Sequence, residues 1–297
     1  CKLKEAEISL RKAIELNPDL AEVHYNLGII LTDLGKLKEA ELSLRKAIQL
    51  KPHTALSHRD LGICLYLMGD IYSALNCLEK ANCLDPKEFG NQTLLNIFQK
   101  EKNSKNRDLT TNKKKKTTSE MRLESNPLIL NMPVEKELID SLYKIKARDQ
   151  EKYQSPTYGN AKGSDYKLFE RSDPIISTIK EKLMNISRDS VKSDIFISES
   201  FFTIFRSGGG LKSHNHLNKL DNIKCLDLAS RKYSLVYYLS VGDQNCNEPG
   251  ILKLENPYQE ILPNNGLIII FPAGRKHSVF YKGEKDRIII GVNFYII

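Results

Sequence analysis

The sequence predicts a multidomain α + β protein, in which an α-helical solenoid is followed by a β-rich domain with flanking helices. Two observations carry this prediction. A 34-residue period runs through the first hundred residues. After about residue 190, β-branched and aromatic residues dominate and apolar positions recur every second residue, which is the spacing of strands. With 297 residues, 40% of them hydrophobic, the chain is long enough to bury two cores.

The 34-residue repeat organises residues 1–100. The segment KLKEAEISLRKAIELNPD (Lys2–Asp19) returns almost unchanged as KLKEAELSLRKAIQLKPH (Lys36–His53). Small residues allow two helices to pack closely, and a proline just after a helix ends it without breaking an internal hydrogen bond. Successive units carry these residues at equivalent positions: Ala6, Ala40 and Ala74; Gly28 and Gly62; Pro18, Pro52 and Pro86.

These residues resemble the tetratricopeptide repeat (TPR), a helix–turn–helix unit of this length. The first unit is truncated, two full units follow, and Lys87–Asn103 is expected to cap the stack, so we expect further repeats upstream. The resemblance implies an interaction scaffold. Its concave face, with residues such as Tyr25, Ile29, Arg59 and Tyr66, is expected to bind a protein or peptide partner.

Residues 101–123 are predicted to be a basic, flexible linker. Between Glu101 and Arg122 there are eight basic and three acidic residues, without hydrophobic periodicity. No aromatic residue interleaves the KKKK run, as a single-strand groove would require, so no nucleic-acid partner is predicted. No apolar run approaches the roughly 18–20 residues of a membrane span, so no membrane partner is predicted either. The six cysteines lack CxxC spacing, and we expect a cytoplasmic protein with reduced thiols.

Residues 124–297 are predicted to form the β-rich domain. Two amphipathic helices come first, Pro133–Gln150 and Asp173–Ser187, the second with Asp173 as its cap. Short strands separated by glycine-, asparagine- or proline-bearing turns favour a sandwich or barrel, for which the double-sheet jelly roll is one solution. The predicted strands are Asp194–Arg206, Tyr233–Ser240, Gly250–Leu254, Gly266–Phe271, His277–Lys282 and Asp286–Ile296.

Three of the six histidines fall in this domain and form a candidate metal site. His214 and His216 stand one residue apart at the mouth of a predicted strand, and His277 begins a later one. Two ligands from one segment and a third from a neighbouring strand can form a facial site. Nitrogen and oxygen donors on one face, with open positions opposite, suit non-haem Fe(II). The run Gly208–Gly210 is predicted to be a flexible turn that lets backbone pass close to the metal.

A cation and an amide lie on the last predicted strand. Arg287 follows His277 by ten residues, and its guanidinium can hold a carboxylate through two parallel hydrogen bonds. Asn293 is on the same face of that strand by even spacing. Tyr237 and Tyr238 are consecutive on a strand, so only one of them can face the cavity.

Four segments together resemble the Fe(II)/2-oxoglutarate-dependent oxygenases that are often fused to TPR units in microbes. They are SFFTIFRSGGGLKSHNHLNKLD, YSLVYYLSVGDQNCNEPGILKLENP, ILPNNGLIIIFPAGRKHSVFY and DRIIIGVNFY. The resemblance covers about residues 127–297 and implies a double-stranded β-helix (jelly roll) that uses Fe(II), O2 and 2-oxoglutarate.

By this resemblance, His277 is the distal iron ligand and Arg287 binds the far carboxylate of 2-oxoglutarate. Asn293 and Tyr237 are the further candidates for binding that co-substrate, although Tyr237 is alternatively a core residue. No catalytic residue is expected beyond the metal ligands.

The sequence departs from the wider family at the acid of its H-x-D/E motif, where His216 stands. Three interpretations remain open: all three histidines bind the metal, only one of the pair binds while Asp221 or a water completes the shell, or the site is weakened. A structural alternative is a solvated pair of loop histidines beside a packed His277.

The predicted function is therefore an Fe(II)- and 2-oxoglutarate-dependent dioxygenase, a hydroxylase, with an N-terminal TPR scaffold. One alternative is a non-catalytic TPR scaffold or binding protein with a degenerate jelly roll, which the missing acid favours. The other is a three-histidine, cupin-like dioxygenase that does not use 2-oxoglutarate. The presence of Arg287 at the family spacing favours the first reading over the last.

Overall fold

The computed structural model describes residues 2–110, 126–146, 148–149 and 159–297. The chain divides into two compact units, Cys1–Lys114 with Ile223–Asp227, and Lys115–Asn222 with Leu228–Ile297. Most of the predicted linker, residues 111–123, lies outside the described residues. No helix within the described ranges is long and apolar enough to cross a membrane.

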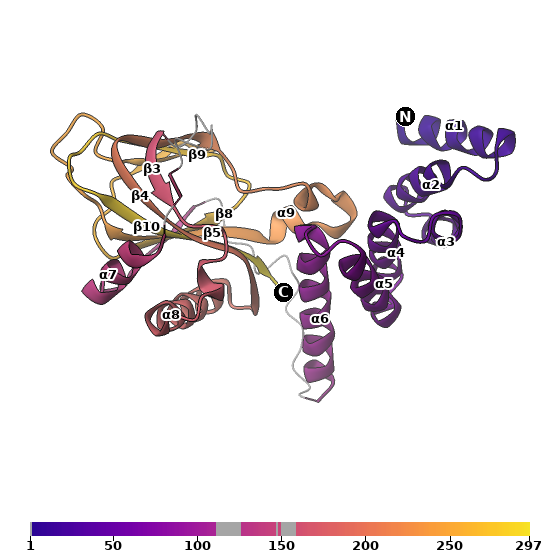
Figure 1. Cartoon of the computed structure of the whole chain (residues 1–297), viewed down its shortest axis with the longest axis horizontal. Helices are drawn as coiled ribbons and strands as arrows, with labels where there is room; N and C mark the ends of the chain where they lie inside the picture. The colour runs from indigo at the N-terminus through magenta and orange to yellow at the C-terminus, as the bar shows by residue number, and fades with distance from the viewer. Residues whose placement is uncertain (1, 111–125, 147, 150–158) are drawn as a thin grey trace. The chain divides into compact units, whose positions relative to one another are not determined.

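The first unit is a series of helix pairs (Figure 1). Its helices are α1 (Lys2–Leu16), α2 (Ala21–Asp33), α3 (Leu37–Leu50), α4 (Ala55–Leu67), α5 (Ile71–Leu84) and α6 (Phe89–Thr110). Helices α2, α4 and α6 begin 34 residues apart, as do α3 and α5, which confirms the helical repeat. The capping helix was predicted to end at Asn103, but α6 continues to Thr110 because the polar segment between them contains no proline or glycine to stop it.

Small residues allow the close helix packing in this unit. Ala40 is fully buried, and a methyl group at Gly28 would lie 2.5 Å from Cγ of Leu44 on the next helix. His24 and His58, one period apart, each contact the carbonyl oxygen of the preceding proline turn through Nε2, at 2.8 and 2.9 Å. These two histidines therefore have the same structural role in successive repeats.

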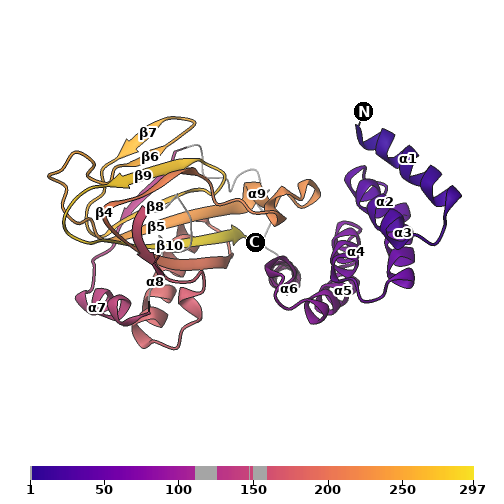
Figure 2. The same ribbon diagram turned by 45° about the horizontal axis from the view of Figure 1, so that its top comes forward.

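The second unit is built on one ten-stranded sheet whose strand pairs are antiparallel (Figures 1 and 2). The main path runs β1-β8-β5-β10-β4-β9-β6-β7, and β3 pairs with both β2 and β4. The strands are β1 (Leu128–Asn131), β2 (Arg148–Asp149), β3 (Gly159–Gly163), β4 (Ile195–His214), β5 (Lys232–Ser240), β6 (Leu252–Leu254), β7 (Gln259–Ile261), β8 (Leu267–Pro272), β9 (His277–Tyr281) and β10 (Arg287–Ile296). Its helices are α7 (Lys136–Lys144), α8 (Pro174–Val191) and α9 (Leu228–Arg231).

The six predicted strands are present. Five of them differ from the prediction by at most two residues at either end, whereas β4 continues eight residues beyond the predicted end at Arg206. Strands β1, β2, β3 and β7 were not predicted. Asp173 caps α8 as predicted, since its Oδ1 accepts the N–H of Ile175 at 2.8 Å. Helix α7 is shorter than the predicted helix over Pro133–Gln150, because Ile145 has an extended backbone (ψ 129°) that ends it. Residues 147 and 150 of that predicted helix lie outside the described residues.

The long strand β4 links the two halves of the sheet. Up to Phe205 it pairs with β10, and from Gly209 it pairs with β9, so that His214 lies opposite His277. The run Gly208–Gly210 is part of this strand, so the predicted flexible turn was wrong. Methyl groups at Gly209 and Gly210 would collide with the backbones of β3 and β9, so these glycines permit close approach of neighbouring strands rather than a turn.

Two apolar cores lie on opposite faces of the sheet. One packs the sheet against α7 and α8 and includes Leu142, Leu183 and Ile290. The other lies between the two halves of the sheet and includes Phe205 and Ile289. Consecutive residues of β10 thus point to different cores, as the period of two in a strand requires. The candidate site lies on the face with the second core, which is called the inner face below.

Candidate metal centre

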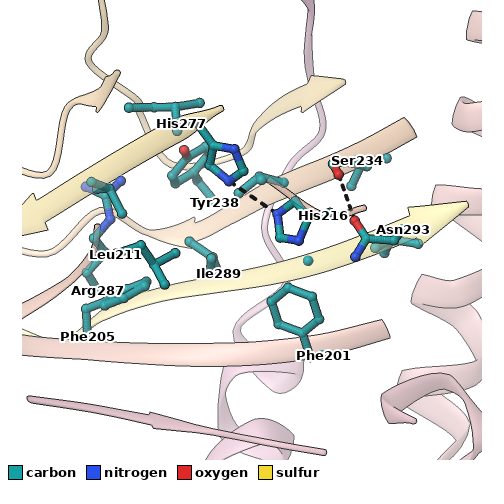
Figure 3. Close-up of a pocket in the computed structure, with 16 residues that line it drawn as sticks. Phe201, Phe205, Leu211, His216, Ser234, Tyr238, His277, Arg287, Ile289 and Asn293 are labelled. Atoms are coloured by element: carbon teal, nitrogen blue, oxygen red, sulfur yellow. Dashed lines mark hydrogen bonds between the residues drawn. The ribbon is translucent and has the colours of Figure 1, made fainter. Parts of the chain in front are cut away.

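A cavity lies on the inner face of the sheet, with about 480 Å³ of empty space that includes open solvent. Most of its lining is apolar, and the chemistry is concentrated in a few side chains (Figure 3). These polar lining residues are His216, Ser234, His277, Arg287 and Asn293. The sequence analysis had named four of these five residues as site candidates, and Ser234 was the exception.

His214, His216 and His277 form a histidine cluster, in which one ring nitrogen of each residue lies within 4.8 Å of the others. His214 ends β4 and His277 begins the adjacent β9, so their backbones are paired in register. His216 follows in the loop after β4, and its backbone N–H donates to the carbonyl of Ala273 at 2.9 Å. The structure therefore brings together all three histidines that the sequence indicated.

Backbone carbonyls orient two of these rings. Nδ1 of His214 lies 2.8 Å from the carbonyl oxygen of Lys212, and Nδ1 of His277 lies 3.2 Å from that of Arg275. A carbonyl oxygen can only accept, so Nδ1 carries the hydrogen in both rings. The lone pair is then on Nε2, and this arrangement is usual for histidines that bind a metal.

The spacing of two donor atoms fits one metal ion. Nε2 of His216 and Nε2 of His277 are 3.2 Å apart. With metal–nitrogen bonds of about 2.1 Å, two ligands of the same ion are separated by about 3.0 Å at a right angle and by about 3.4 Å at the tetrahedral angle. The observed distance lies between these values, so the two imidazoles are placed as neighbouring ligands.

The cluster is electrically neutral at neutral pH. Burial lowers the pKa of His277 to about 4, with a further contribution from the nearby His214. Burial also lowers the pKa of His216 well below its usual value, with His277 as the second cause, and lowers the pKa of His214. All three rings therefore keep a free nitrogen lone pair at neutral pH, as metal binding requires.

Arg287 is a buried cation in the same cavity. It is 1% exposed, and none of the described residues places a carboxylate in an ion pair with it. One terminal nitrogen donates to the carbonyl of Pro249 at 3.2 Å, its Nε has no described partner, and its guanidinium lies 5.1 Å from the centre of the Tyr238 ring. Burial lowers its pKa, and leaving a buried charge uncompensated is costly.

The backbone of Gly250 lies directly against this guanidinium. A methyl group at Gly250 would be 1.7 Å from the terminal nitrogen of Arg287, far inside any permitted contact. Gly250 also has a φ of 83°, which other residues rarely adopt. The sequence analysis placed Gly250 only at the start of a predicted strand, and the contacts of Pro249 and Gly250 with Arg287 depend on the fold.

The other end of β10 carries a short polar chain. The hydroxyl of Ser234 donates to Oδ1 of Asn293 at 2.7 Å, as Figure 3 shows. Nδ2 of Asn293 donates to the carboxylate of Glu199. Glu199 and Asn293 are cross-strand partners on β4 and β10. Ser234 and Glu199 were not predicted, because only the register of three strands brings them to Asn293.

Two candidates from the sequence lie elsewhere. Tyr237 is outside the cavity, where its hydroxyl donates to the carbonyl of Pro133 at 3.0 Å, and it is Tyr238 that lines the cavity. Asp221 is not in the histidine cluster. Its carboxylate is buried against Lys232 at 2.9 Å and accepts the hydroxyl of Tyr295 at 2.6 Å, so it is fully engaged as the partner of a buried lysine.

Comparison with known proteins identifies the helical repeat only. No curated protein matches the chain. A mutant O-GlcNAc transferase from Thermobaculum terrenum is 25% identical over 32% of this chain and 18% of its own length, with a TM-score of 0.32. A crystal structure of MamA is 21% identical over 34% of this chain and 59% of its own, with a TM-score of 0.33. MamA from Desulfovibrio magneticus RS-1 is 22% identical over 34% of this chain and 58% of its own, with a TM-score of 0.34.

In each of these comparisons the chain covers less than two thirds of the other structure. The family model of the tetratricopeptide repeat matches residues 21–54, which comprise α2, α3 and the turns beside them. Proteins stacked from such units present extended concave surfaces that bind other proteins. The chain thus carries a tetratricopeptide repeat at residues 21–54, within the helical unit that the 34-residue period predicted.

Proposed function

We propose that the second unit is a jelly-roll, Fe(II)- and 2-oxoglutarate-dependent oxygenase that hydroxylates its substrate. The observation that carries this proposal is that a cluster of three neutral imidazoles, two of which line the cavity, lies in the same site as a buried guanidinium that has no ion-pair partner among the described residues. The imidazoles suit a divalent metal, and the guanidinium suits a carboxylate. A small carboxylate that binds beside a metal satisfies both requirements.

The histidine cluster would hold the metal through Nε2 of His277 and one ring nitrogen each of His214 and His216. Fe(II) bound there would supply the O2 activation that hydroxylation of a C–H bond needs. The protein fixes the ligand geometry, because strand pairing aligns His214 with His277 and the two backbone carbonyls orient their rings. Because the cluster offers three donors, the metal would keep coordination positions for other ligands.

Arg287 would select the co-substrate. Its guanidinium is buried among aromatic rings, where an electrostatic contact is stronger than in water. With neutral histidines and no carboxylate in the cluster, the metal keeps its full charge. One carboxylate of a dianion such as 2-oxoglutarate would offset part of that charge, and the other would pair with Arg287. Tyr238 replaces Tyr237 as the tyrosine beside this site.

The repeat unit supports a protein or peptide as the substrate. Its helices follow the 34-residue period from α2 to α6, so the unit offers a regular surface for an extended chain. We propose that this surface recruits the substrate while the cavity carries out the chemistry. The identity of the partner does not affect the test of the reaction itself.

The test is Fe(II)-dependent formation of succinate from 2-oxoglutarate by the purified chain, together with binding measurements on Arg287→Ala and His277→Ala. Arg287→Ala should weaken 2-oxoglutarate binding by about 30- to 1000-fold, equivalent to a bidentate charge-assisted contact of about 2–4 kcal/mol, and should leave Fe(II) binding unchanged. His277→Ala should lose Fe(II). Arg206→Ala, on the exposed side of β4, is the matched control and should change neither.

Other outcomes would assign a different function. Fe(II) binding that is unaffected by 2-oxoglutarate would indicate a three-histidine dioxygenase of the cupin type. Failure of the parent chain to bind either ligand would indicate a scaffold that does not catalyse a reaction.

A further inference from the structure

Arg287 lines one end of the cavity, and the other end is lined by Asn293, whose amide donates to the carboxylate of Glu199. Arg287 stands at the start of β10, and the carboxylate of Glu199 stands beside Asn293, six residues further along the same strand. At about 3.3 Å per residue these two positions are roughly 20 Å apart along β10. The histidine cluster contributes to the lining between them through His216 and His277.

One co-substrate cannot occupy both ends. A five-carbon dicarboxylate has four C–C bonds of about 1.5 Å, so its terminal carbons are separated by at most about 6 Å. Bound between Arg287 and the metal, it would leave the end of the cavity at Asn293, beside Glu199, open to a second ligand. This step, in which the second ligand is the molecule to be hydroxylated, rests on the proposed function.

The hydrogen bonds at this end fix its polarity. Oδ1 of Asn293 accepts from the buried hydroxyl of Ser234, so the amide nitrogen must face Glu199, to which it donates. That contact uses only part of the acceptor capacity of the carboxylate. Glu199 is half-buried, and it makes no ion pair with any residue in the described part of the chain. The nearby buried acid Asp221, by contrast, is paired with Lys232.

We infer that Glu199, with Asn293 and Ser234, forms a subsite for a cationic hydrogen-bond donor on the substrate, an ammonium or guanidinium group. A partly buried carboxylate with free acceptor sites and no cation beside it is best satisfied by a charged donor. The other end of the cavity excludes that group, because Arg287 has the same sign. Charge therefore sorts the two ligands, with the anion at one end and the cation at the other.

The same chemistry is found in a basic side chain of a peptide and in a small free amine, and the experiment separates them. Binding to the full chain is measured by titration calorimetry for three probes: agmatine, the capped tripeptide Ac-Ala-Arg-Ala-NH2, and its neutral isostere with citrulline in place of arginine. The arginine tripeptide should bind about 10- to 100-fold more tightly than the citrulline tripeptide. Tighter binding of the tripeptide than of agmatine identifies a peptide, and the reverse identifies a small amine.

Glu199→Gln should abolish the preference for arginine over citrulline, and Glu284→Gln, an exposed acid in the turn before β10, should retain it. Unchanged preference in Glu199→Gln, or equal binding of both tripeptides by the parent chain, overturns the inference. Thermal unfolding of each variant verifies that it is folded, and Glu199→Asp should restore part of the preference.

The two proposals fail in different measurements. The preference for a cation is measured without 2-oxoglutarate and should persist in Arg287→Ala. Loss of 2-oxoglutarate binding with the cation preference intact would refute the proposed co-substrate and leave the cation subsite standing.

Discussion

Replacing Gly250 with alanine tests the anion site without removing its charge. The added methyl group would lie 1.7 Å from the terminal nitrogen of Arg287 and 2.5 Å from its Cζ, whereas ordinary contacts begin at 3.4 Å. The guanidinium must therefore move by about 1.7 Å. A displacement of that size is well beyond the roughly 0.5 Å tolerance of a binding constellation and disrupts the 3.2 Å hydrogen bond to Pro249.

We expect Gly250→Ala to weaken 2-oxoglutarate binding nearly as much as Arg287→Ala, by about 30- to 1000-fold, and to leave Fe(II) binding unchanged. Alanine at a positive φ also costs stability, about 1–2 kcal/mol. Gly208→Ala is the matched control, because Gly208 has a φ of 86° and no atom of the described residues lies within 4 Å of the added methyl group. Both variants should lose the stability that the positive φ costs, Gly250→Ala should lose more because of its clash, and only Gly250→Ala should lose affinity.

Calorimetric titration of 2-oxoglutarate into the anaerobic, Fe(II)-loaded protein measures this difference, and thermal unfolding measures the shared strain. If Gly250→Ala binds 2-oxoglutarate like the parent, Arg287 does not hold the co-substrate in the position described. If Gly208→Ala loses affinity equally, the effect comes from strain and not from the contact.

Further predictions concern other parts of the molecule. Alanine at any member of the histidine cluster should abolish Fe(II) binding in equilibrium dialysis, whereas His53→Ala should not; a member that can be lost without effect is not a ligand. His277 has a pKa of about 4 when folded and about 6.5 when unfolded, so the unfolded state takes up its proton first as the pH falls. Metal-free protein should therefore lose about 2 kcal/mol of unfolding free energy between pH 6.5 and 5, and His277→Gln should lose less; an identical pH profile would contradict this. Lys232→Met leaves the buried Asp221 without its ion-pair partner and should lower the free energy of unfolding in denaturant by about 3–5 kcal/mol. The double change Lys232→Met/Asp221→Leu should recover much of this loss, and no recovery would show that the pair contributes more than charge balance. The repeat unit expressed alone as residues 2–110 should melt cooperatively as a helix, and a disordered spectrum would refute its independence.

The parts of the fold that follow a short-range period were predictable from the sequence. The 34-residue period located the helices from α2 to α6, and alternation located the six strands that carry the candidate site. The strands that were missed, such as β1 (Leu128–Asn131) and β3 (Gly159–Gly163), are short and gain their order from pairing with β8 and β4. Such pairing is tertiary information that no local pattern contains.

The candidate site divides in the same way. The histidines, Arg287 and Asn293 could be identified by residue type and spacing. The choice between Tyr237 and Tyr238 could not, because it depends on which face of β5 meets the cavity. The role of Asp221 was also hidden, since its partner Lys232 lies on another element and only the fold brings the two charges together.

Strand β4 has a mechanical consequence for the cavity. Glu199 near its start and His214 at its end are joined by one continuous strand that pairs with β10 and then with β9. The distance along the chain between Glu199 of the cation subsite and His214 of the histidine cluster is therefore fixed by the length of this strand. A single-residue insertion between them would rotate every following side chain to the opposite face.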